Sequence, residues 1–237
     1  MKLGDDMKNK IYKILVFVFY ILSLFILLLS TRVGLNYKIY LNTNTSMVLL
    51  LLACVFIYIN GIILIKKLNY NKKILKINLV IYFIIYTITI CSLTLFEEIY
   101  GRQGLIIIEW NRELLNMYLK HSFNIIPFNT IKLFIQGYMN GIVSFKNFSV
   151  NIIGNVLAFM PYGLFLPLIF KKMKKYYKFL ITMVFIVIVI ELLQFITMSG
   201  ACDIDDLILN VLGASIIYFI AKIKCINNFI HKIFLWE

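Results

Sequence analysis

Charged residues are scarce in this sequence. Asp, Glu, Lys and Arg together make up 15% of the 237 residues, whereas hydrophobic residues make up 62%. A soluble domain is about half apolar and about a quarter charged, so a soluble protein of this length could not bury so much apolar surface. The shortage of charge therefore argues against a soluble enzyme and predicts an integral membrane protein.

Acidic residues are much rarer than basic residues, since the sequence has 11 Asp and Glu against 24 Lys and Arg. The resulting net charge of +13 could indicate a protein that binds nucleic acid. The basic residues, however, gather in short clusters between apolar runs, which is typical of a membrane-topology signal. We therefore expect no nucleic acid as a partner.

Motifs for metal binding and redox chemistry are also missing. The four cysteines form no CxxC pair, and the two histidines, His121 and His231, lack the spacing of metal ligands. There is no phosphate-binding loop and no serine with a base at a recognisable spacing. The sequence predicts neither a metal site nor a cofactor.

Long uncharged runs predict about six transmembrane helices, because crossing the hydrocarbon core takes roughly 20 apolar residues. The predicted spans are residues 14–30, 47–65, 77–96, 150–170, 179–197 and 207–221. The first could instead belong to a signal peptide, but no small-residue cleavage site follows it, which favours a retained helix. The last span is short, and Glu191 interrupts the fifth.

The lysines predict the orientation of these spans. Most of them fall before the first span, between the second and third, between the fourth and fifth, and after the sixth. The positive-inside rule then places both termini in the cytoplasm. We expect an all-helical, multi-pass membrane protein with two N-terminal helices in residues 1–76, a membrane domain in residues 77–221 and a cytoplasmic tail in residues 222–237.

The long outer segment between the third and fourth spans is too apolar for a simple loop. Residues 105–120 mix charged and bulky apolar side chains, which predicts an amphipathic helix on the membrane surface. Pro127 should end any helix, and Asn129 or Thr130 could cap a new one that begins near Ile131. We expect this segment to pack on the outer ends of the spans or to dip into the interface.

Polar residues at membrane depth are costly, and here they form one stripe on each of the last three spans. Helical spacing puts the members of each stripe on one face. The stripes comprise Asn151, Asn155 and Tyr162 on the fourth span, Glu191 and Gln194 on the fifth, and Asp203, Asp206, Asn210 and Gly213 on the sixth. Orientation and depth place all three toward the outer side, which predicts an outward-facing acidic pocket.

Several of these residues also have a structural explanation. Asn151 and Gln194 could simply join helices through hydrogen bonds. Asp205 should face water or a headgroup cation rather than the pocket. Glycines and prolines in the last spans predict close helix contacts and kinks. These residues are Gly154, Pro161, Gly163, Pro167 and Gly213.

Four motifs in sequence order resemble those of the VanZ-like family. They are NIIPFNTI at residues 124–131, NIIGNVLAFMPYGLFLP at 151–167, IELLQ at 190–194 and DIDDLILNVLGA at 203–214. The resemblance covers about residues 80–221 and leaves out the first two predicted spans. Many family members carry an arginine just ahead of the acidic cluster, where this chain reads MSGACDIDD, so the role of that arginine is unfilled or has moved here.

The resemblance implies a small protein of the bacterial cytoplasmic membrane, in a family whose founding member is associated with low-level resistance to the lipoglycopeptide teicoplanin. It implies no established reaction. The motif residues carried over coincide with the predicted pocket and its surroundings. They are Pro127, Asn155, Pro161, Gly163, Glu191, Gln194, Asp203, Asp206 and Asn210.

Three functions are open at this point. The first is a non-enzymatic cell-envelope protein whose pocket engages a membrane lipid, a lipid-linked cell-wall precursor or the glycopeptide antibiotic. The second is an enzyme that modifies a lipid or precursor, with Glu191 and Asp206 as general acid and base. The third is a small proton-linked transporter or flippase with Glu191 as its proton site. The sequence predicts no particular oligomeric state.

Overall fold

The computed structural model describes residues 2–30, 43–69, 73–96, 111–197 and 200–234. These residues are almost entirely helical, as the long apolar runs predict. The chain forms two compact units, one from residues 1–85 with 231–237 and the other from residues 86–230.

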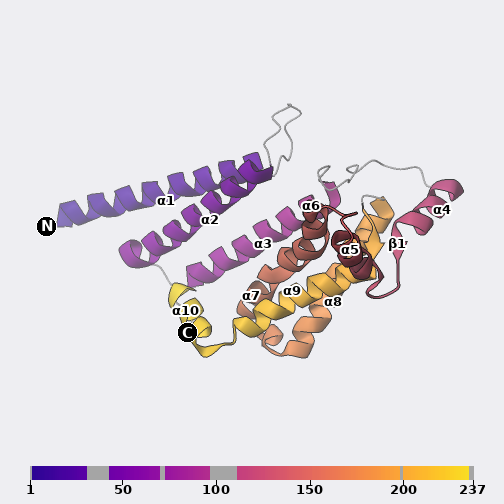
Figure 1. Ribbon diagram of the computed structural model, residues 1–237. Helices are drawn as coiled ribbons and strands as arrows, with labels where there is room; N and C mark the ends of the chain where they lie inside the picture. Colours follow the sequence, from indigo (N-terminus) through magenta and orange to yellow (C-terminus); the bar gives the residue numbers. More distant parts are fainter. Residues whose placement is uncertain (1, 31–42, 70–72, 97–110, 198–199, 235–237) are drawn as a thin grey trace. The chain divides into compact units, whose positions relative to one another are not determined.

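The elements follow one another along the chain as shown in Figure 1. The α-helices are α1 (Lys2–Ser30), α2 (Thr43–Leu68), α3 (Lys73–Phe96), α4 (Arg112–His121), α5 (Asn129–Met139), α6 (Phe145–Phe148), α7 (Asn155–Ile169), α8 (Tyr176–Thr197), α9 (Ile204–Ile220) and α10 (Lys224–Phe234). The short elements are the strands β1 (Phe123–Asn124) and β2 (Cys202–Asp203), the π-helical turn η2 (Ser149–Gly154) and the 3-10 turn η3 (Lys171–Lys174).

The first unit is built from α1, α2 and the beginning of α3. Apolar side chains join α1 to α2, where the rings of Phe19 and Phe56 stack with centroids 5.7 Å apart. Asn78 of α3 donates through Nδ2 to the carbonyl oxygen of Ile57 on α2 at 3.1 Å. Because Asn78 is only 1% exposed, this bond gives its amide nitrogen a partner that it would otherwise lack among apolar side chains, whereas its Oδ1 accepts no bond from the described residues.

The second unit has a core of three long helices, in which α7 and α9 run in the same direction and α8 runs against them (Figure 1). Asn155 at the start of α7 bonds Asp206 near the start of α9. Tyr176 at the start of α8 bonds Ser215 near the end of α9, with 3.2 Å between the two hydroxyl oxygens. The ends of the three helices therefore lie at two common levels.

Two glycines allow α7 and α9 to come close together. A Cβ on Gly163 would overlap the backbone of Ala214, and a Cβ on Gly213 would overlap the backbone of Val156. A glycine in each helix thus lets the partner backbone approach, as in other membrane helix pairs. Gly154 differs, because a Cβ there would meet only the carbonyl oxygen of Ser149 at 3.6 Å, which is ordinary contact.

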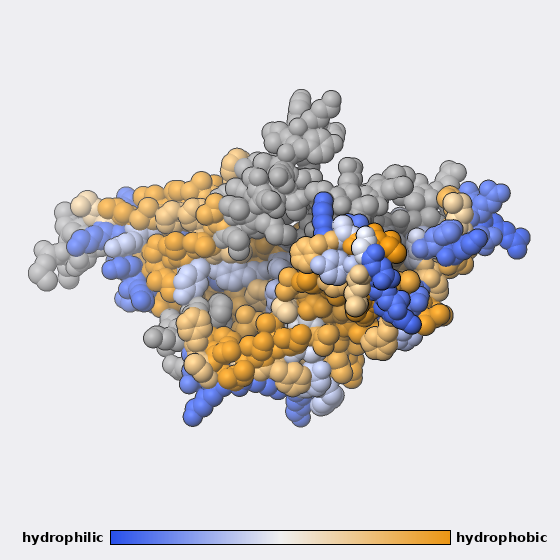
Figure 2. All heavy atoms as spheres, viewed as in Figure 1, coloured by the Kyte–Doolittle hydropathy of each residue, from blue (hydrophilic) through white to orange (hydrophobic). Residues whose placement is uncertain are grey.

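Three helical stretches of the described chain are long and apolar enough to cross a membrane: Lys73–Cys91, Phe145–Ile169 and Tyr176–Thr197. Ile204–Ile220 with Lys224–His231 would be a fourth if the two were one span, although they are bent by 85°. All six predicted spans fall on helices, and Figure 2 shows apolar residues over most of the described helical surface. The number six and the orientation stay predictions.

The segment before α7 contains the predicted break at Pro127. Helix α4 covers the last part of the predicted surface helix, whereas residues 105–110 lie outside the described residues. Strands β1 and β2 pair in parallel, with Asn124 opposite Asp203. Helix α5 ends in a left-handed turn at Gly141, whose φ is +70°, a conformation that glycine adopts without strain.

Candidate functional site

Four carboxylates lie at one end of the second unit, which we call the acidic end. They belong to Glu191 on α8 and to Asp203, Asp205 and Asp206 at the start of α9. Burial raises the pKa of the Cys202 thiol, and the nearby charges of Glu191, Asp203 and Asp206 raise it further. The structure thus brings Glu191, Asp203 and Asp206 near one thiol, although they come from two helices.

Glu191 fixes the start of α9 against α8. Glu191 is only 8% exposed, and its Oε2 accepts a hydrogen bond from the backbone N–H of Asp203 at 3.1 Å. Asp203 in turn caps α9, because its Oδ1 accepts from the backbone N–H of Asp205 at 2.8 Å. The two carboxylates thus determine where α9 begins relative to α8.

Asp203 also connects α9 to the segment that follows α4. Its Oδ1 accepts from Nδ2 of Asn124 at 2.9 Å, and the same Nδ2 contacts Oγ1 of Thr130 at 3.0 Å. One residue earlier, the backbone N–H of Cys202 donates to the carbonyl oxygen of Ser122 at 2.8 Å. Backbone pairing and a side-chain bond therefore hold β1 beside the acidic end.

Asp205 corrects two of the predictions. It was expected to face water or a cation, but it is 0% exposed. Its Oδ1 accepts from the backbone N–H of Phe128 at 2.5 Å, and its Oδ2 accepts from that of Ile131 at 3.0 Å. The side chain thus caps α5 from another helix, whereas Asn129 or Thr130 was predicted to do so.

The physical reason lies in the first turn of α5. The first N–H groups of a helix have no partner within it, and the positive end of the helix dipole favours a negative charge. Phe128 precedes α5 in a left-handed conformation with φ +64°, and its side chain makes no capping bond. Because a carboxylate with two such donors recovers the cost of leaving water, Asp205 is buried here.

Asp206 joins α9 to α7. Its Oδ1 accepts from Nδ2 of Asn155 at 2.5 Å, and the same amide contacts the carbonyl oxygen of Asn151 at 2.9 Å. Asn151 is exposed in the π-helical turn η2, where its Nδ2 donates to the carbonyl oxygen of Asn147 at 2.8 Å. Of the predicted stripe on the fourth span, Asn155 therefore contacts the acidic end directly.

Two other predicted residues are bonded to α3. Nε2 of Gln194 donates to the carbonyl oxygen of Thr94 at 3.0 Å, and the Tyr162 hydroxyl lies 3.2 Å from Oγ1 of Thr87. Both side chains are buried, at 3% and 0% exposure. Their bonds join the fourth and fifth predicted spans to the third.

Asn210 lies one turn beyond Asp206 on α9 and is 4% exposed. It falls between Asp206 and Gly213, both of which contact α7, so it belongs to the α7-facing side of α9. Oδ1 of Asn210 and Oε1 of Gln194 accept no hydrogen bond from the residues that the structure describes. The polar stripes on the fifth and sixth predicted spans thus contain two buried amide oxygens in addition to the carboxylate oxygens of the acidic end.

The predicted site residues omitted Asn124, which bonds Asp203, and Tyr118, whose hydroxyl donates to the carbonyl oxygen of Gly200 at 2.7 Å. Asn124 is the first residue of the NIIPFNTI motif, and that position was the signal for it. Tyr118 had no such signal, because its partner is a backbone carbonyl far along the chain.

The chemistry of the acidic end is that of hydrogen-bond acceptors. Carboxylates accept and, when ionised, do not donate, so such an end suits ligands with ammonium, hydroxyl or amide donors. Within the described ranges, no three His, Cys, Asp or Glu side chains are arranged to hold a metal ion.

Comparison with protein families shows which family this chain matches. A family model described as VanZ/LLP1 covers residues 83–225, a range that runs from α3 to the start of α10 and contains the whole acidic end. Comparisons with curated proteins and with solved structures gave no match. The family model covers more than half of the chain, and this membrane-helix protein belongs to the VanZ-like family.

Proposed function

We propose that this protein acts in the bacterial cytoplasmic membrane and contributes to resistance against teicoplanin-type lipoglycopeptides. In this proposal the acidic end faces outward and engages a membrane lipid, a lipid-linked cell-wall precursor or the antibiotic itself. The observation that carries the proposal is the meeting of Asn155, Glu191 and Asp206 at one end of three apolar helices.

The lysines support the outward orientation of the acidic end. Lys171, Lys172 and Lys174 lie in η3, which joins the far ends of α7 and α8. The acidic end and these lysines are thus at opposite ends of the same helices. Because positively charged turns stay in the cytoplasm, this separation favours an extracytoplasmic acidic end.

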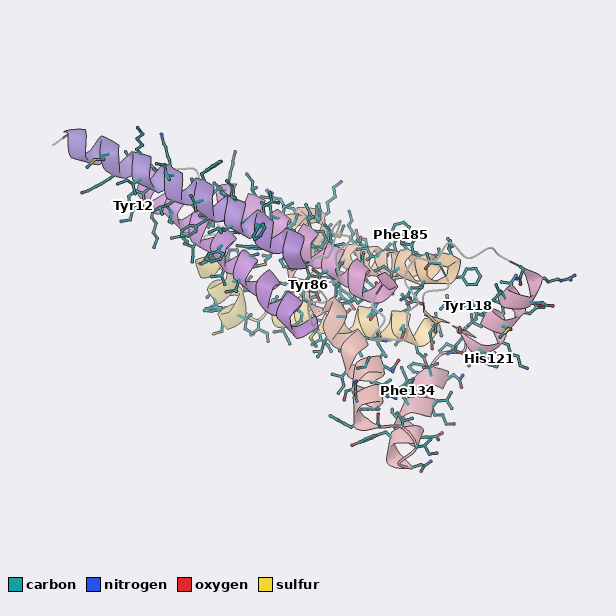
Figure 3. All side chains as sticks on the ribbon, turned by 90° about the horizontal axis from the view of Figure 1, so that it is seen from above. Tyr12, Tyr86, Tyr118, His121, Phe134 and Phe185 are labelled. Carbon is teal, nitrogen blue, oxygen red and sulfur yellow. The ribbon has the colours of Figure 1, made fainter. Side chains whose placement is uncertain are left out.

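The surroundings of α5 support a ligand with an apolar chain. Large apolar side chains are highly exposed from just before α5 to α6. Figure 3 shows this segment, with Phe134, projecting away from α8 and α9. The exposed side chains include Ile125 at 68%, Phe128 at 62%, Leu133 at 60%, Met139 at 78%, Ile142 at 80% and Phe145 at 63% exposure. Such a surface suits the boundary between headgroups and acyl chains.

Asp205 connects this apolar surface to the acidic end. Since it bonds the first turn of α5 and follows Asp203 by two residues, the two surfaces are held as neighbours. An amphiphile fits both, with its chain in the outer leaflet beside α5 and its polar donors at the carboxylates. Lipids, lipid-linked precursors and acylated glycopeptides all have this form.

The test is drug susceptibility in a sensitive Gram-positive host. Teicoplanin and vancomycin are compared in cells that express no protein, wild type, Glu191→Gln or Glu113→Gln, each verified to reach the membrane. Glu113 is the matched control, because it is an exposed carboxylate on α4 away from the described bonds of the acidic end. We expect wild type and Glu113→Gln to protect selectively against teicoplanin and Glu191→Gln to lose that protection.

Other outcomes would change the proposal in defined ways. If wild type gives no protection, the resistance part is wrong for this chain. If Glu191→Gln protects as well as wild type, the charge of the acidic end has no role in resistance. Protection that disappears when the proton gradient is collapsed would instead indicate a proton-linked transporter, and a chemically altered lipid in membrane extracts would indicate an enzyme.

A further inference from the structure

The opposite end of the second unit carries a dense group of lysines, which we call the basic surface. All of its members are exposed, and they come from η3, from the residue after it and from the stretch between α9 and α10. They are Lys171, Lys172, Lys174, Lys175, Lys222 and Lys224. The sequence has no Asp or Glu between residues 114 and 190 or between 207 and 236, so neither segment brings its own counter-charge.

Tyr218 holds the two parts of the basic surface together. It is 1% exposed, and its hydroxyl donates to the carbonyl oxygen of Lys174 at 2.6 Å. The ammonium group of Lys222 lies 4.2 Å from the centre of the same ring, which is a cation–π contact. A buried side chain thus brings lysines 48 positions apart in sequence into one surface despite their mutual repulsion.

Helix α10 extends this surface sideways. It is bent by 85° from α9, so it does not continue along the axis of α9. Within α10, helical spacing puts Ile226, Phe229 and Ile230 on one side and Lys224 and Asn228 on the other, and Ile223 lies just before the helix. Ile223 and Phe229 are 54% and 62% exposed, whereas Ile230 is buried, so the apolar side is open at the first two of these residues.

We propose that the basic surface and α10 together bind anionic phospholipid headgroups of the inner leaflet, with α10 lying flat in the interface. Converging lysines provide the charge complement to those headgroups, and the apolar side of α10 enters the acyl boundary beneath them. Each lysine near an anionic bilayer raises membrane affinity about fivefold. This inference is independent of the ligand and role of the acidic end.

The alternative is that α10 is the second half of a broken span. It would then carry Lys224, Asn227 and Asn228 into hydrocarbon, where such side chains are expensive. The two arrangements predict different depths along the helix. A flat helix gives a depth that rises and falls with the helical period, whereas a broken span gives a depth that changes steadily in one direction.

Spin labels distinguish these arrangements. The full chain, with its cysteines replaced, receives one nitroxide at a time at positions 223 to 230 and is placed in nanodiscs of phosphatidylcholine with one third phosphatidylglycerol. Collision with oxygen and with a water-soluble nickel complex reports the depth of each label. We expect labels at Ile223→Cys, Ile226→Cys and Phe229→Cys to be deep and labels at Lys224→Cys and Asn228→Cys to contact water. A steady change of depth along the helix would overturn the flat arrangement.

Charge variants test the headgroup preference with the label at Phe229→Cys. We expect this label to be deeper with phosphatidylglycerol than in pure phosphatidylcholine. Lys174→Gln, Lys175→Gln and Lys222→Gln together remove half of the lysines of the basic surface and should clearly reduce that difference. The control set replaces Lys120, Lys132 and Lys146 with glutamine, which removes the same charge from segments outside the basic surface and should leave the difference intact. Equal depth in both lipids for the unmodified basic surface, or equal loss in both variants, would refute the proposal.

Discussion

Replacing Asp205 with alanine should loosen the start of α5 while leaving the start of α7 in place. The Asp205 carboxylate accepts from the backbone N–H groups of Phe128 and Ile131, at 2.5 Å and 3.0 Å. Alanine removes both acceptors and leaves two helix-terminal donors without a protein partner. The loss should therefore be local to α5 before it affects the rest of the unit.

The size of the effect follows from the two bonds. Hydrogen bonds to charged groups contribute about 1.5–3 kcal/mol each. We take the lower end because the Phe128 side chain is 62% exposed, so water can reach the freed donors. Two bonds then give about 3 kcal/mol for local opening, which corresponds to roughly a hundredfold in an equilibrium constant. Asp205→Asn keeps one acceptor oxygen and should have about half that free-energy effect.

Hydrogen exchange measures this change at the two amides concerned. With the protein in nanodiscs, Asp205→Ala should raise the exchange rates of the amides of Phe128 and Ile131 by roughly a hundredfold. The control is Asp206→Asn, one position along, because Asp206 bonds Asn155 of α7, whereas the described bonds to the first turn of α5 come from Asp205. If Asp205→Ala leaves both amides as protected as in wild type, or if Asp206→Asn exposes them equally, Asp205 is not the cap of α5.

Two further predictions concern helix packing and the acidic end. Gly163→Ala should destabilise the protein by about 1–3 kcal/mol, because the new methyl group overlaps the backbone of α9, whereas Gly154→Ala should be neutral or stabilising; thermal unfolding in detergent compares them. Cys202 should be alkylated slowly at pH 8 and faster as the pH rises, because its raised pKa keeps it protonated, while the exposed Cys225 provides the comparison by peptide mass spectrometry. Glu191→Gln removes one of the charges that raise the pKa of Cys202 and should speed its alkylation at pH 8; an unchanged rate would mean that Glu191 does not act on this thiol.

The apolar runs were sufficient to predict the long helices of this protein, although not the short helix α6 or the helix α10 in the predicted tail. Uncharged stretches of about 20 residues can lower their free energy in lipid only by pairing their backbone groups internally, so helix is the required structure. Spacing likewise predicts which polar residues share a face, and Asn155 and Asp206 do meet. Both predictions rest on hydropathy and on spacing along the chain, which can be read directly from the sequence.

The partners of the aspartates could not be predicted in this way. Local rules assign a helix cap to the residue just before the helix, yet the cap of α5 is Asp205, which is 77 residues away from Phe128. Gln194 and Tyr162 were assigned to the predicted pocket because of their helical face, and their bonds to threonines of α3 could not be predicted from that spacing. Which of several possible neighbours a polar side chain meets depends on how the helices pack, and spacing alone does not determine packing.

These partners change what a mutation at the acidic end can show. Asp203, Asp205 and Asp206 bind Asn124, the start of α5 and Asn155 respectively, so removing any of them releases a segment of the protein. Loss of activity in an aspartate-to-alanine variant would therefore report folding as readily as ligand binding. Glu191→Gln is the more informative change, because the amide oxygen of glutamine can still accept from the N–H of Asp203 while the charge is removed. A loss of teicoplanin protection in that variant, with the amides of α5 still protected from exchange, would assign the loss to charge at the acidic end.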